Sequence, residues 1–257
     1  DVPKIRLLSF NVYFGRKGCR AIGDEIASHS PDVVALQATA NRCKRELAAR
    51  FPDFHVEDDL DFLLFSRFPV LDRLRGPMLP GALPAEWVRY TLDTPLGAVD
   101  LFSVHPFSPR AGFEALRGDG LRTELRDQLA DPHAPRGRAE VEANTSIREQ
   151  QLARFTEAAA ASKNPVIIAG DTNLPALSRL YARYLDSGEG RWRDGFAQVG
   201  LGFGYTFPAQ GSRREMPWMR IDRILASPEL RFLHFEVGGR TASDHCPVLA
   251  DVARSGS

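Results

Sequence analysis

Short apolar runs recur along the chain, and segments of helical spacing or high charge lie between several of them. Such runs are typical of buried strands when turn residues bound them. The strands that they predict span residues 5–12, 33–36, 62–65, 88–92, 99–105, 165–170, 221–225 and 248–252. The predicted helices span residues 19–29, about 41–50 and about 147–161. Strand and helix alternate near the start and again toward the end, which indicates a layered α/β domain.

The middle of the chain differs from its two ends. Thr94-Pro95-Leu96-Gly97 predicts a hairpin turn, so the strands on either side of it are expected to be antiparallel. Residues 106–148 contain several Pro and Gly and no convincing apolar strand. We interpret them either as a solvated surface insertion with one or two helices or as a substrate-facing lid. Because no segment has the composition of a linker, we predict a single domain over residues 1–254 that contains this insertion.

Composition narrows the class of protein only a little. Lys and Arg number 33 and Asp and Glu number 33, so the formal net charge is zero. A protein that coats nucleic acid non-specifically is usually strongly basic, and the bulk charge gives no support for that role. Local charge is uneven, since residues 1–50 hold nine Lys or Arg against five Asp or Glu. No run of about 18 apolar residues could span a membrane.

The three cysteines, Cys19, Cys43 and Cys246, have no CxxC spacing, so a zinc site is not predicted. Two interpretations remain open. In the first, all three are unpaired, partly buried thiols. In the second, Cys19 and Cys43 form a disulfide, which implies an oxidising compartment.

Two polar motifs stand beside predicted strands. Gly170-Asp171-Thr172-Asn173 follows the strand at 165–170, and the end of a strand is where an α/β fold presents its site. Ser243-Asp244-His245 directly precedes the last strand, and a carboxylate paired with a histidine can fix its tautomer and stabilise developing charge. Taken alone, each motif is equally consistent with an ordinary polar turn.

Three further residues are candidates because of where they stand. Asp222 interrupts an apolar strand, where a carboxylate is costly unless a partner or a metal meets it. Its structural interpretation is a salt bridge with Arg220 or Arg223. Asn11 ends the first strand and His105 ends the strand that begins near residue 99. Each of these residues alone is more often structural than catalytic.

The order of these motifs resembles the endonuclease/exonuclease/phosphatase superfamily, which includes deoxyribonuclease I, from Leu7 to Val252. The segments that carry the resemblance are Leu8-Ser9-Phe10-Asn11-Val12, Pro31-Asp32-Val33-Val34-Ala35-Leu36-Gln37, Ser66-Arg67-Phe68-Pro69-Val70, Gly170-Asp171-Thr172-Asn173, Arg220-Ile221-Asp222 and Ser243-Asp244-His245. The resemblance implies a four-layer α/β sandwich, in which two mixed β-sheets pack face to face with helices outside. It also implies metal-dependent hydrolysis of phosphate esters.

The resemblance implies a role for each candidate residue. Asp171 would orient and deprotonate the attacking water. His245, oriented by Asp222, would donate a proton to a phosphoryl oxygen. The side chains that would contact the phosphate are Asn11, Asn173, His105 and His245. The metal, Mg²⁺ or Mn²⁺, would be held by Asp244, by Asn11 and by a Glu at position 38.

Position 38 departs from the family pattern. The family motif normally ends Leu-Gln-Glu, whereas this chain reads Leu36-Gln37-Ala38. A methyl group cannot bind Mg²⁺, which needs hard oxygen ligands. Because the surrounding motifs are intact, we interpret Ala38 as a replacement that inactivates this form; natural loss of the metal site is the alternative.

The substrate is less constrained than the chemistry. We favour a nuclease that cleaves phosphodiester bonds in DNA or RNA, with nucleic acid as the partner and no stable protein partner implied. The alternatives are a phosphatase or phospholipase on lipid-linked phosphate or pyrophosphate, and a non-catalytic phosphate-binding module. Aromatic residues in the segment at 202–208 would stack on a base or simply pack. An extracytoplasmic location, periplasmic or secreted, is expected.

Overall fold

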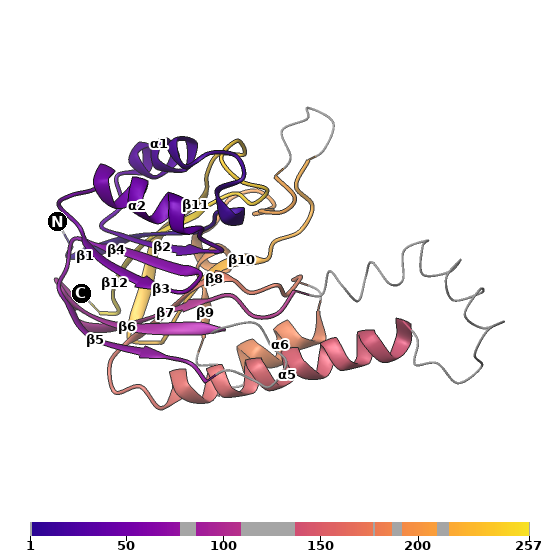
Figure 1. The fold of residues 1–257 in the computed structure, drawn as a ribbon. Helices are drawn as coiled ribbons and strands as arrows, with labels where there is room; N and C mark the ends of the chain where they lie inside the picture. The colour runs from indigo at the N-terminus through magenta and orange to yellow at the C-terminus, as the bar shows by residue number, and fades with distance from the viewer. Residues whose placement is uncertain are drawn as a thin grey trace.

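The computed structural model describes residues 2–77, 86–108, 137–176, 178–186, 192–209 and 216–256; for 137–143 and 185–186 it describes the backbone alone. The described chain forms two six-stranded sheets that pack face to face, with helices on both outer faces (Figure 1). The predicted four-layer α/β sandwich is therefore confirmed. Among the described helices, none is both long enough and apolar enough to cross a membrane.

The first sheet has the strand order β11-β12-β1-β2-β4-β3. Its strands are β1 (Lys4–Asn11), β2 (Val33–Gln37), β3 (His55–Asp59), β4 (Phe62–Ser66), β11 (Leu230–Val237) and β12 (Val248–Arg254). The first strand, β1, lies between β12, to which it is antiparallel, and β2, to which it is parallel. Two helices, α1 (Cys19–His29) and α2 (Asn41–Arg50), cover the outer face of this sheet and bury Ile22, Ile26 and Leu47 there.

The second sheet has the strand order β5-β6-β7-β8-β10-β9. Its strands are β5 (Val70–Arg75), β6 (Trp87–Thr94), β7 (Gly97–Val104), β8 (Val166–Asp171), β9 (Arg193–Asp194) and β10 (Asp222–Ala226). The predicted hairpin turn is confirmed, because β6 and β7 pair antiparallel from Trp87–Val104 to Thr94–Gly97. The outer face is covered by α5 (Gly137–Ala160) and α6 (Arg179–Asp186). The part of the chain that the structure describes also contains two short helices, η1 (Tyr13–Gly15) and α7 (Gly195–Val199).

The structure corrects the expected boundaries in three places. The helix expected at about 147–161 is α5, which begins ten residues earlier at Gly137. Residues 137–148 of the expected insertion therefore belong to that helix, and residues 109–136, with the lid interpretation, lie outside the described residues. Strands β3, β5 and β11 were not predicted, because their alternation is broken by charged and exposed side chains, as is common at sheet edges.

The cysteines follow the second interpretation. Cys19, at the start of α1, forms a disulfide with Cys43 of α2, and Cys246 is a buried free thiol. The interpretation as three unpaired thiols is wrong. Gly15 is required beside this bond, since its φ is +68° and a Cβ there would meet the Sγ of Cys43 at 2.2 Å.

The two-residue period of the strands carries polar side chains into one end of the space between the sheets. In β1 the interior row begins with Ile5 and Leu7 and ends with Asn11, and in β8 it begins with Ile167 and Ala169 and ends with Asp171. The apolar members of these rows form the inter-sheet core. Asn11 and Asp171 lie at the carboxyl ends of β1 and β8, and Asp222, the first residue of antiparallel β10, lies at the same end of the sheets, which places the candidate site.

Candidate active site

Asp171 lies at the centre of the candidate site and is almost completely buried, with 2% of its surface exposed. Its Oδ2 accepts a hydrogen bond from Nδ2 of Asn11 at 3.0 Å, which joins the ends of β8 and β1 across the two sheets. Its Oδ1 accepts from the backbone N–H of Asn173 at 2.8 Å. The carboxylate is therefore held in one orientation by donors from two different segments.

The backbone around Asp171 is shaped for this position. Gly170 has a φ of +152° and passes so close to β7 that a Cβ would meet the carbonyl oxygen of Val104 at 2.0 Å. Asn173 has a φ of +51°, a conformation that non-glycine residues adopt uncommonly. Its Nδ2 donates to the carbonyl oxygen of Pro106 at 2.9 Å. The loop after β8 is thus tied to the segment that follows β7.

His245 and Asp222 form the second part of the site. Nδ1 of His245 lies 2.9 Å from Oδ2 of Asp222, and both residues are buried. The other ring nitrogen, Nε2, lies 3.7 Å from Oδ2 of Asp171 and 4.0 Å from Oδ1 of Asp244. Burial opposes a charge on His245, but Asp222 and then Asp171 outweigh it and raise the pKa of His245 to about 9. At neutral pH the ring is therefore an imidazolium that can donate from Nε2.

The alternative interpretation of Asp222 as a salt-bridge partner of Arg220 or Arg223 is wrong. In the described residues both arginines pair with Asp194, at 2.5 Å for Arg220 and 3.4 Å for Arg223. Asp222 instead faces the inter-sheet space, directly opposite Asp171 in the antiparallel register of β10 and β8.

His105 joins the same cluster from β7. Its Nε2 lies 3.8 Å from Oδ2 of Asp171, and its Nδ1 lies 3.2 Å from Oδ2 of Asp61. Burial lowers the pKa of His105, but the hydrogen bond with Asp61 and the charge of Asp171 outweigh burial, and the net shift is upward. Asp61 was missed from the sequence, because an Asp in the turn between β3 and β4 has no feature that separates it from an ordinary turn residue.

The donor set expected for a metal is incomplete. Ala38 is buried with a φ of +52°, and it follows Gln37, which lies opposite Asn11 in the register of β1 and β2. Its side chain offers no oxygen, so Asn11 and Asp244 remain as the expected ligands, and this pair does not fit Mg²⁺ in the chain as it stands. A buried acidic and histidine cluster does exist: one ligand atom each from Asp171, Asp222 and His245 lie within 4.8 Å of one another.

Helix α5 contributes polar residues that the sequence analysis missed. Gln151 accepts from the backbone N–H of Phe107, Asn144 donates to the carbonyl oxygen of Ser108, and Arg148 donates to the carbonyl oxygen of Asn173. Their spacing of three to four residues puts them on one face of the helix. This spacing indicates a polar helix face, but the sequence pattern places residues up to 148 in a surface insertion.

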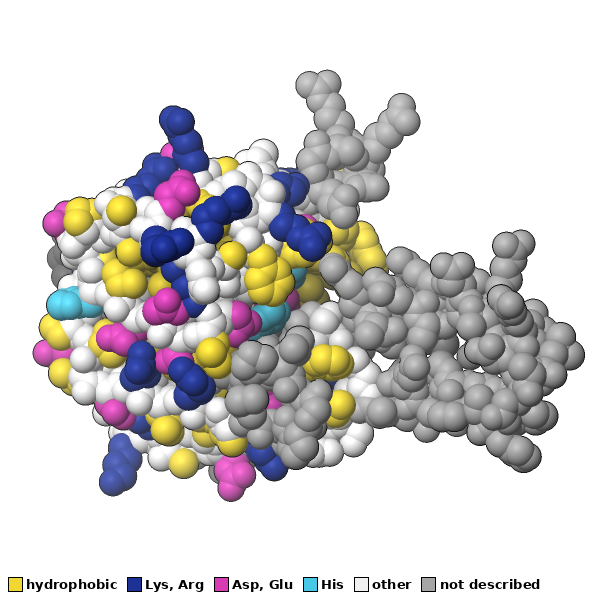
Figure 2. Space-filling model, viewed as in Figure 1, with side chains coloured by type: hydrophobic (Ala, Val, Ile, Leu, Met, Phe, Trp, Pro, Cys, Tyr) yellow, Lys and Arg dark blue, Asp and Glu magenta, His cyan; other side chains and the backbone are white. Residues whose placement is uncertain are grey.

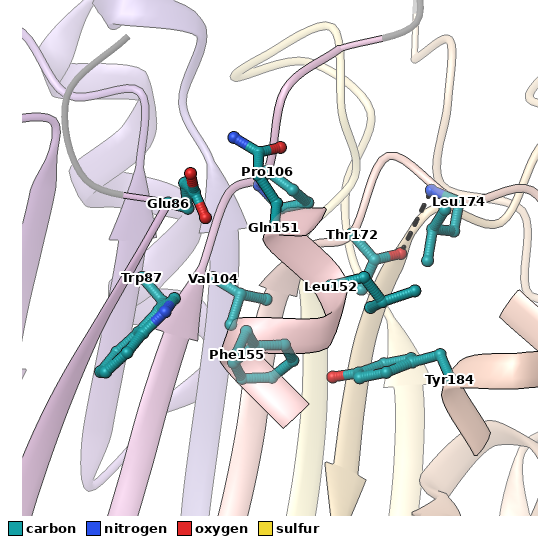
Figure 3. A pocket seen from close by; sticks show the side chains of 10 residues that line it. All are labelled: Glu86, Trp87, Val104, Pro106, Gln151, Leu152, Phe155, Thr172, Leu174 and Tyr184. Atoms are coloured by element: carbon teal, nitrogen blue, oxygen red, sulfur yellow. Dashed lines mark hydrogen bonds between the residues drawn. The ribbon is translucent and has the colours of Figure 1, made fainter. Parts of the chain in front are cut away.

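A small cavity lies between α5, the end of β7 and the segment after β8 (Figure 3). Its volume is about 20 Å³, and its lining combines Thr172 and Leu174 with the aromatic side chains Trp87, Phe155 and Tyr184. A space of this size holds about one water molecule. This cavity is therefore too small to hold a substrate.

Phe207 packs against His245, and the centroids of the two rings are 4.7 Å apart. The same segment holds the motif at 243–245 through its backbone: Cys246 donates to the carbonyl oxygen of Thr206 at 2.8 Å, and Ala209 donates to that of Asp244 at 2.6 Å. The structure thus brings together Asn11, His105, Asp171, Asn173, Asp222, Asp244 and His245 at one end of the two sheets.

Comparison with known proteins agrees with this geometry. The model of the endonuclease/exonuclease/phosphatase family matches residues 8–245. The chain therefore belongs to the endonuclease/exonuclease/phosphatase family, whose members are phosphoesterase hydrolases. A search of curated proteins finds no match.

Solved structures with this fold come from several organisms. An endonuclease/exonuclease/phosphatase from Beutenbergia cavernae DSM 12333 has a TM-score of 0.69 and 18% identity over 99% of this chain and 72% of that one. A mannosyl-6-phosphatase from Bacteroides thetaiotaomicron VPI-5482 has a TM-score of 0.70 and 15% identity over 97% of this chain and 99% of that one. TDP2 of D. rerio, complexed with a single-strand DNA product, has a TM-score of 0.67 and 18% identity over 97% of this chain and 98% of that one. At these identities the likeness establishes the fold.

Proposed function

We propose that this chain has the site of a phosphodiesterase that cleaves nucleic acid, and that Ala38 holds the present form inactive. The observation that carries the proposal is the convergence of Asp171, Asp222 and His245 at one end of the inter-sheet space. A phosphodiester resists attack because its oxygens are charged, so hydrolysis needs an activated water and counter-charge at the phosphoryl oxygens.

The contacts support a division of labour between these residues. Asp171 is fixed by Asn11 and by the backbone of Asn173, so its carboxylate would orient and deprotonate a water. Asp222 occupies Nδ1 of His245 and leaves Nε2 directed to the same place, from which it would donate to a phosphoryl oxygen. His105 would make a second contact to the phosphate. A divalent metal, Mg²⁺ or Mn²⁺, would add charge stabilisation once position 38 offers an oxygen ligand.

The preference for nucleic acid rests on two supports. The D. rerio TDP2 structure with the same fold is a complex with single-strand DNA product. Several Lys and Arg side chains also show over α1 and α2 in Figure 2, in agreement with the basic excess of residues 1–50. A phosphomonoesterase is the second candidate, because a mannosyl-6-phosphatase shares the fold.

The test is the Ala38→Glu variant, assayed with Mg²⁺ and with Mn²⁺ against the present chain. Activity on bis(p-nitrophenyl) phosphate should rise by several orders of magnitude, because a metal contributes several kcal/mol and each 1.36 kcal/mol is about tenfold in rate. Ala38→Gln is the matched control, since it has similar size without the carboxylate, and it should gain far less. Equal rates in all three proteins would contradict the proposal.

Parallel assays on single- and double-stranded DNA, RNA, p-nitrophenyl phosphate, a sugar phosphate and a polyprenyl phosphate distinguish the two candidates. A nuclease should weaken steeply with added salt, because bound phosphates release counterions. Turnover of monoesters or lipid phosphate without cleavage of any nucleic acid would replace the first candidate by a phosphatase.

A further inference from the structure

Five large apolar side chains lie exposed on two neighbouring segments beside the site. We call them the apolar platform: Leu201, Phe203, Tyr205, Met216 and Trp218. Leu201 is 92% exposed, Phe203 79% and Trp218 59%. In Figure 2, hydrophobic side chains show at the surface where Figure 1 places the orange segment that leads to β10. Exposed apolar residues scattered singly are normal, but a group of this kind marks an interaction site.

Local structure holds the platform outward. Residues 203–207 alternate between the exposed and the buried side, so Phe203 and Tyr205 share the outer face while Thr206 is fully buried. Gly204 has a φ of +64° and lies so close to Phe196 that a Cβ would meet its ring at 2.4 Å. The absence of a side chain at Gly204 therefore lets the backbone pack inward and turns its two aromatic neighbours toward solvent.

The apolar platform lies next to the candidate site along the same two segments. Phe207, two residues beyond Tyr205, contacts the ring of His245, and its backbone pairs with Met219, the residue after Trp218. The hydroxyl of Thr206 accepts from the backbone N–H of Asp222 at 3.2 Å. Because an extended chain rises about 3.3 Å per residue, Tyr205 stands about 7 Å along the chain from the residue that touches His245.

The rings of Phe203 and Tyr205 are already arranged as a stack. Their centroids are 5.4 Å apart and their planes differ by 7°. Arg240 adds a cation beside the platform, since its guanidinium lies 3.3 Å from the sulfur of Met216. Ring faces together with a cation are the combination that binds single-stranded nucleic acid, in which bases stack on aromatic rings and basic groups follow the backbone.

We propose that the apolar platform binds unpaired nucleobases of a single-stranded nucleic acid. These bases would lie next to the position at which a substrate phosphate would face His245. The proposal rests on the proposed function, for which it names the substrate class. A base stacked on Tyr205 would belong to a nucleotide close to the reacting phosphate, whereas paired bases in a duplex would not present their faces. The platform would therefore select unpaired strands or ends over intact duplex.

Binding can be measured on the present chain, without turnover, by fluorescence anisotropy of a labelled single-stranded oligonucleotide. Trp218 gives a second signal, because Trp87 and Trp192 are buried at 3% and 5% exposure and only Trp218 among the three is open to a stacking base. Binding should quench its emission. A strand of the same length with abasic sugars in place of nucleosides should bind more weakly.

The decisive variant is Phe203→Leu with Tyr205→Leu, which removes both rings and keeps apolar side chains. It should weaken binding of the single strand by about 5- to 150-fold, the range expected for loss of stacking by one base. Leu71→Ser is the matched control, because Leu71 is 59% exposed on β5 and belongs to a different surface. It should bind as the unchanged chain does. Thermal unfolding checks that each variant is folded.

Equal binding by the ring-free variant, or equal binding of the abasic strand, would overturn the proposal. So would binding to vesicles of neutral and anionic phospholipid in the absence of base-dependent binding, since a lipid surface would use the same residues for their apolar area alone. The proposed function fails separately, when Ala38→Glu does not hydrolyse bis(p-nitrophenyl) phosphate, a diester that contains no nucleobase.

Discussion

Asp222 and Arg223 are neighbours on β10, yet they belong to two buried charged clusters on opposite faces of one sheet. Asp222 faces the inter-sheet space and pairs with His245, whereas Arg223 faces the outer layer, where it pairs with Asp194. The alternation of side chains along a strand separates them completely. The two clusters share their depth of burial but differ in how their charges are balanced.

The outer cluster is saturated with partners. Asp194 accepts from Arg220, from Arg223 and from the hydroxyl of Tyr181, and it also caps α7 by accepting from the backbone N–H of Phe196. The guanidinium of Arg223 lies 3.7 Å from the centre of the Tyr181 ring. Burial raises the pKa of Asp194, but Arg220, Tyr181 and Arg223 outweigh burial and the net shift is downward. Two guanidiniums share the one carboxylate of Asp194, and Arg223 also donates to the carbonyl oxygens of Leu174 and Arg220.

The inner cluster is unbalanced. The carboxylates of Asp171, Asp222 and Asp244 lie around the imidazole of His245, and the imidazole of His105 lies beside Asp171. Like charges held close together in a buried site cost stability. Such an excess of negative charge is found at sites prepared for a cationic partner or for proton transfer. The two clusters therefore differ in the sign of their excess charge: the outer cluster has two guanidiniums to one carboxylate, whereas the inner cluster has three carboxylates to two imidazoles. Burial of charge alone does not mark a site, whereas an excess of buried carboxylates beside histidines does.

The largest expected effect concerns activity of the Ala38→Glu form. His245→Ala and Asp171→Asn should each reduce its turnover by about 10²–10⁴-fold, the range of general acid–base catalysis. Far-UV circular dichroism should show that both variants stay folded. A member of the outer cluster replaced conservatively, Tyr181→Phe, should keep most of the turnover. Near-full activity in either inner-cluster variant would remove the role assigned to that residue.

The next effect concerns the free energy of unfolding. Here a substitution in the outer cluster should have a larger effect than one in the inner cluster. Arg223→Met should lower the free energy of unfolding by about 3–5 kcal/mol, because it breaks a buried ion pair. Asp171→Asn should change that free energy by about 1 kcal/mol or less, since relief of repulsion in the inner cluster offsets a weakened hydrogen bond. Urea denaturation of the two variants provides the comparison. A larger loss for Asp171→Asn than for Arg223→Met would contradict the distinction between the clusters.

The smallest effect is a pH dependence of stability that belongs to the outer cluster. Because the pKa of Asp194 is lowered in the folded chain, the unfolded chain binds its proton first on acidification. The contribution of Asp194 is present above the unfolded pKa, near 3.9, and is lost as pH falls through the folded pKa.

The free energy of unfolding should therefore decline less steeply below about pH 4 in Asp194→Asn than in the unchanged chain. Asp72→Asn, at a side chain that is 60% exposed and pairs with Arg89, serves as the control and should leave the slope unchanged. Equal slopes in all three proteins would show that Asp194 is not the responsible group.

The sequence predicted much of the site because strand ends are readable as such. Asn11 and Asp171 end apolar strands and Asp222 interrupts one, and the two sheets bring those positions together. The sequence did not predict which charged residues form ion pairs with one another. Arg220 and Arg223 stand beside Asp222 in sequence, but their actual partner, Asp194, is 26 and 29 residues away. Pairings of that kind depend on the third dimension, which spacing along a strand does not encode.

The sequence predicted the fold about as completely as it predicted the site, and the elements that it missed have related physical causes. Buried strands such as β2 and β4 were predicted to within one residue, because both faces are apolar. Edge strand β5 was missed, since five of its six side chains are exposed. The face of α5 that carries Asn144, Arg148 and Gln151 is polar toward the protein interior, so its pattern opposed the rule that identifies helices by apolar periodicity.

The position of β1 has a consequence for the order in which the molecule is made. β1 is synthesised before the other strands of its sheet, yet it lies between β2 and β12. Until β12 has been synthesised, one edge of β1 carries unpaired backbone groups, which are a template for misassociation with other strands. Pairing across more than 200 residues gives a high contact order and slows folding. Asn11 and His245 come together only after that pairing, so the candidate site cannot assemble before β12 has been made.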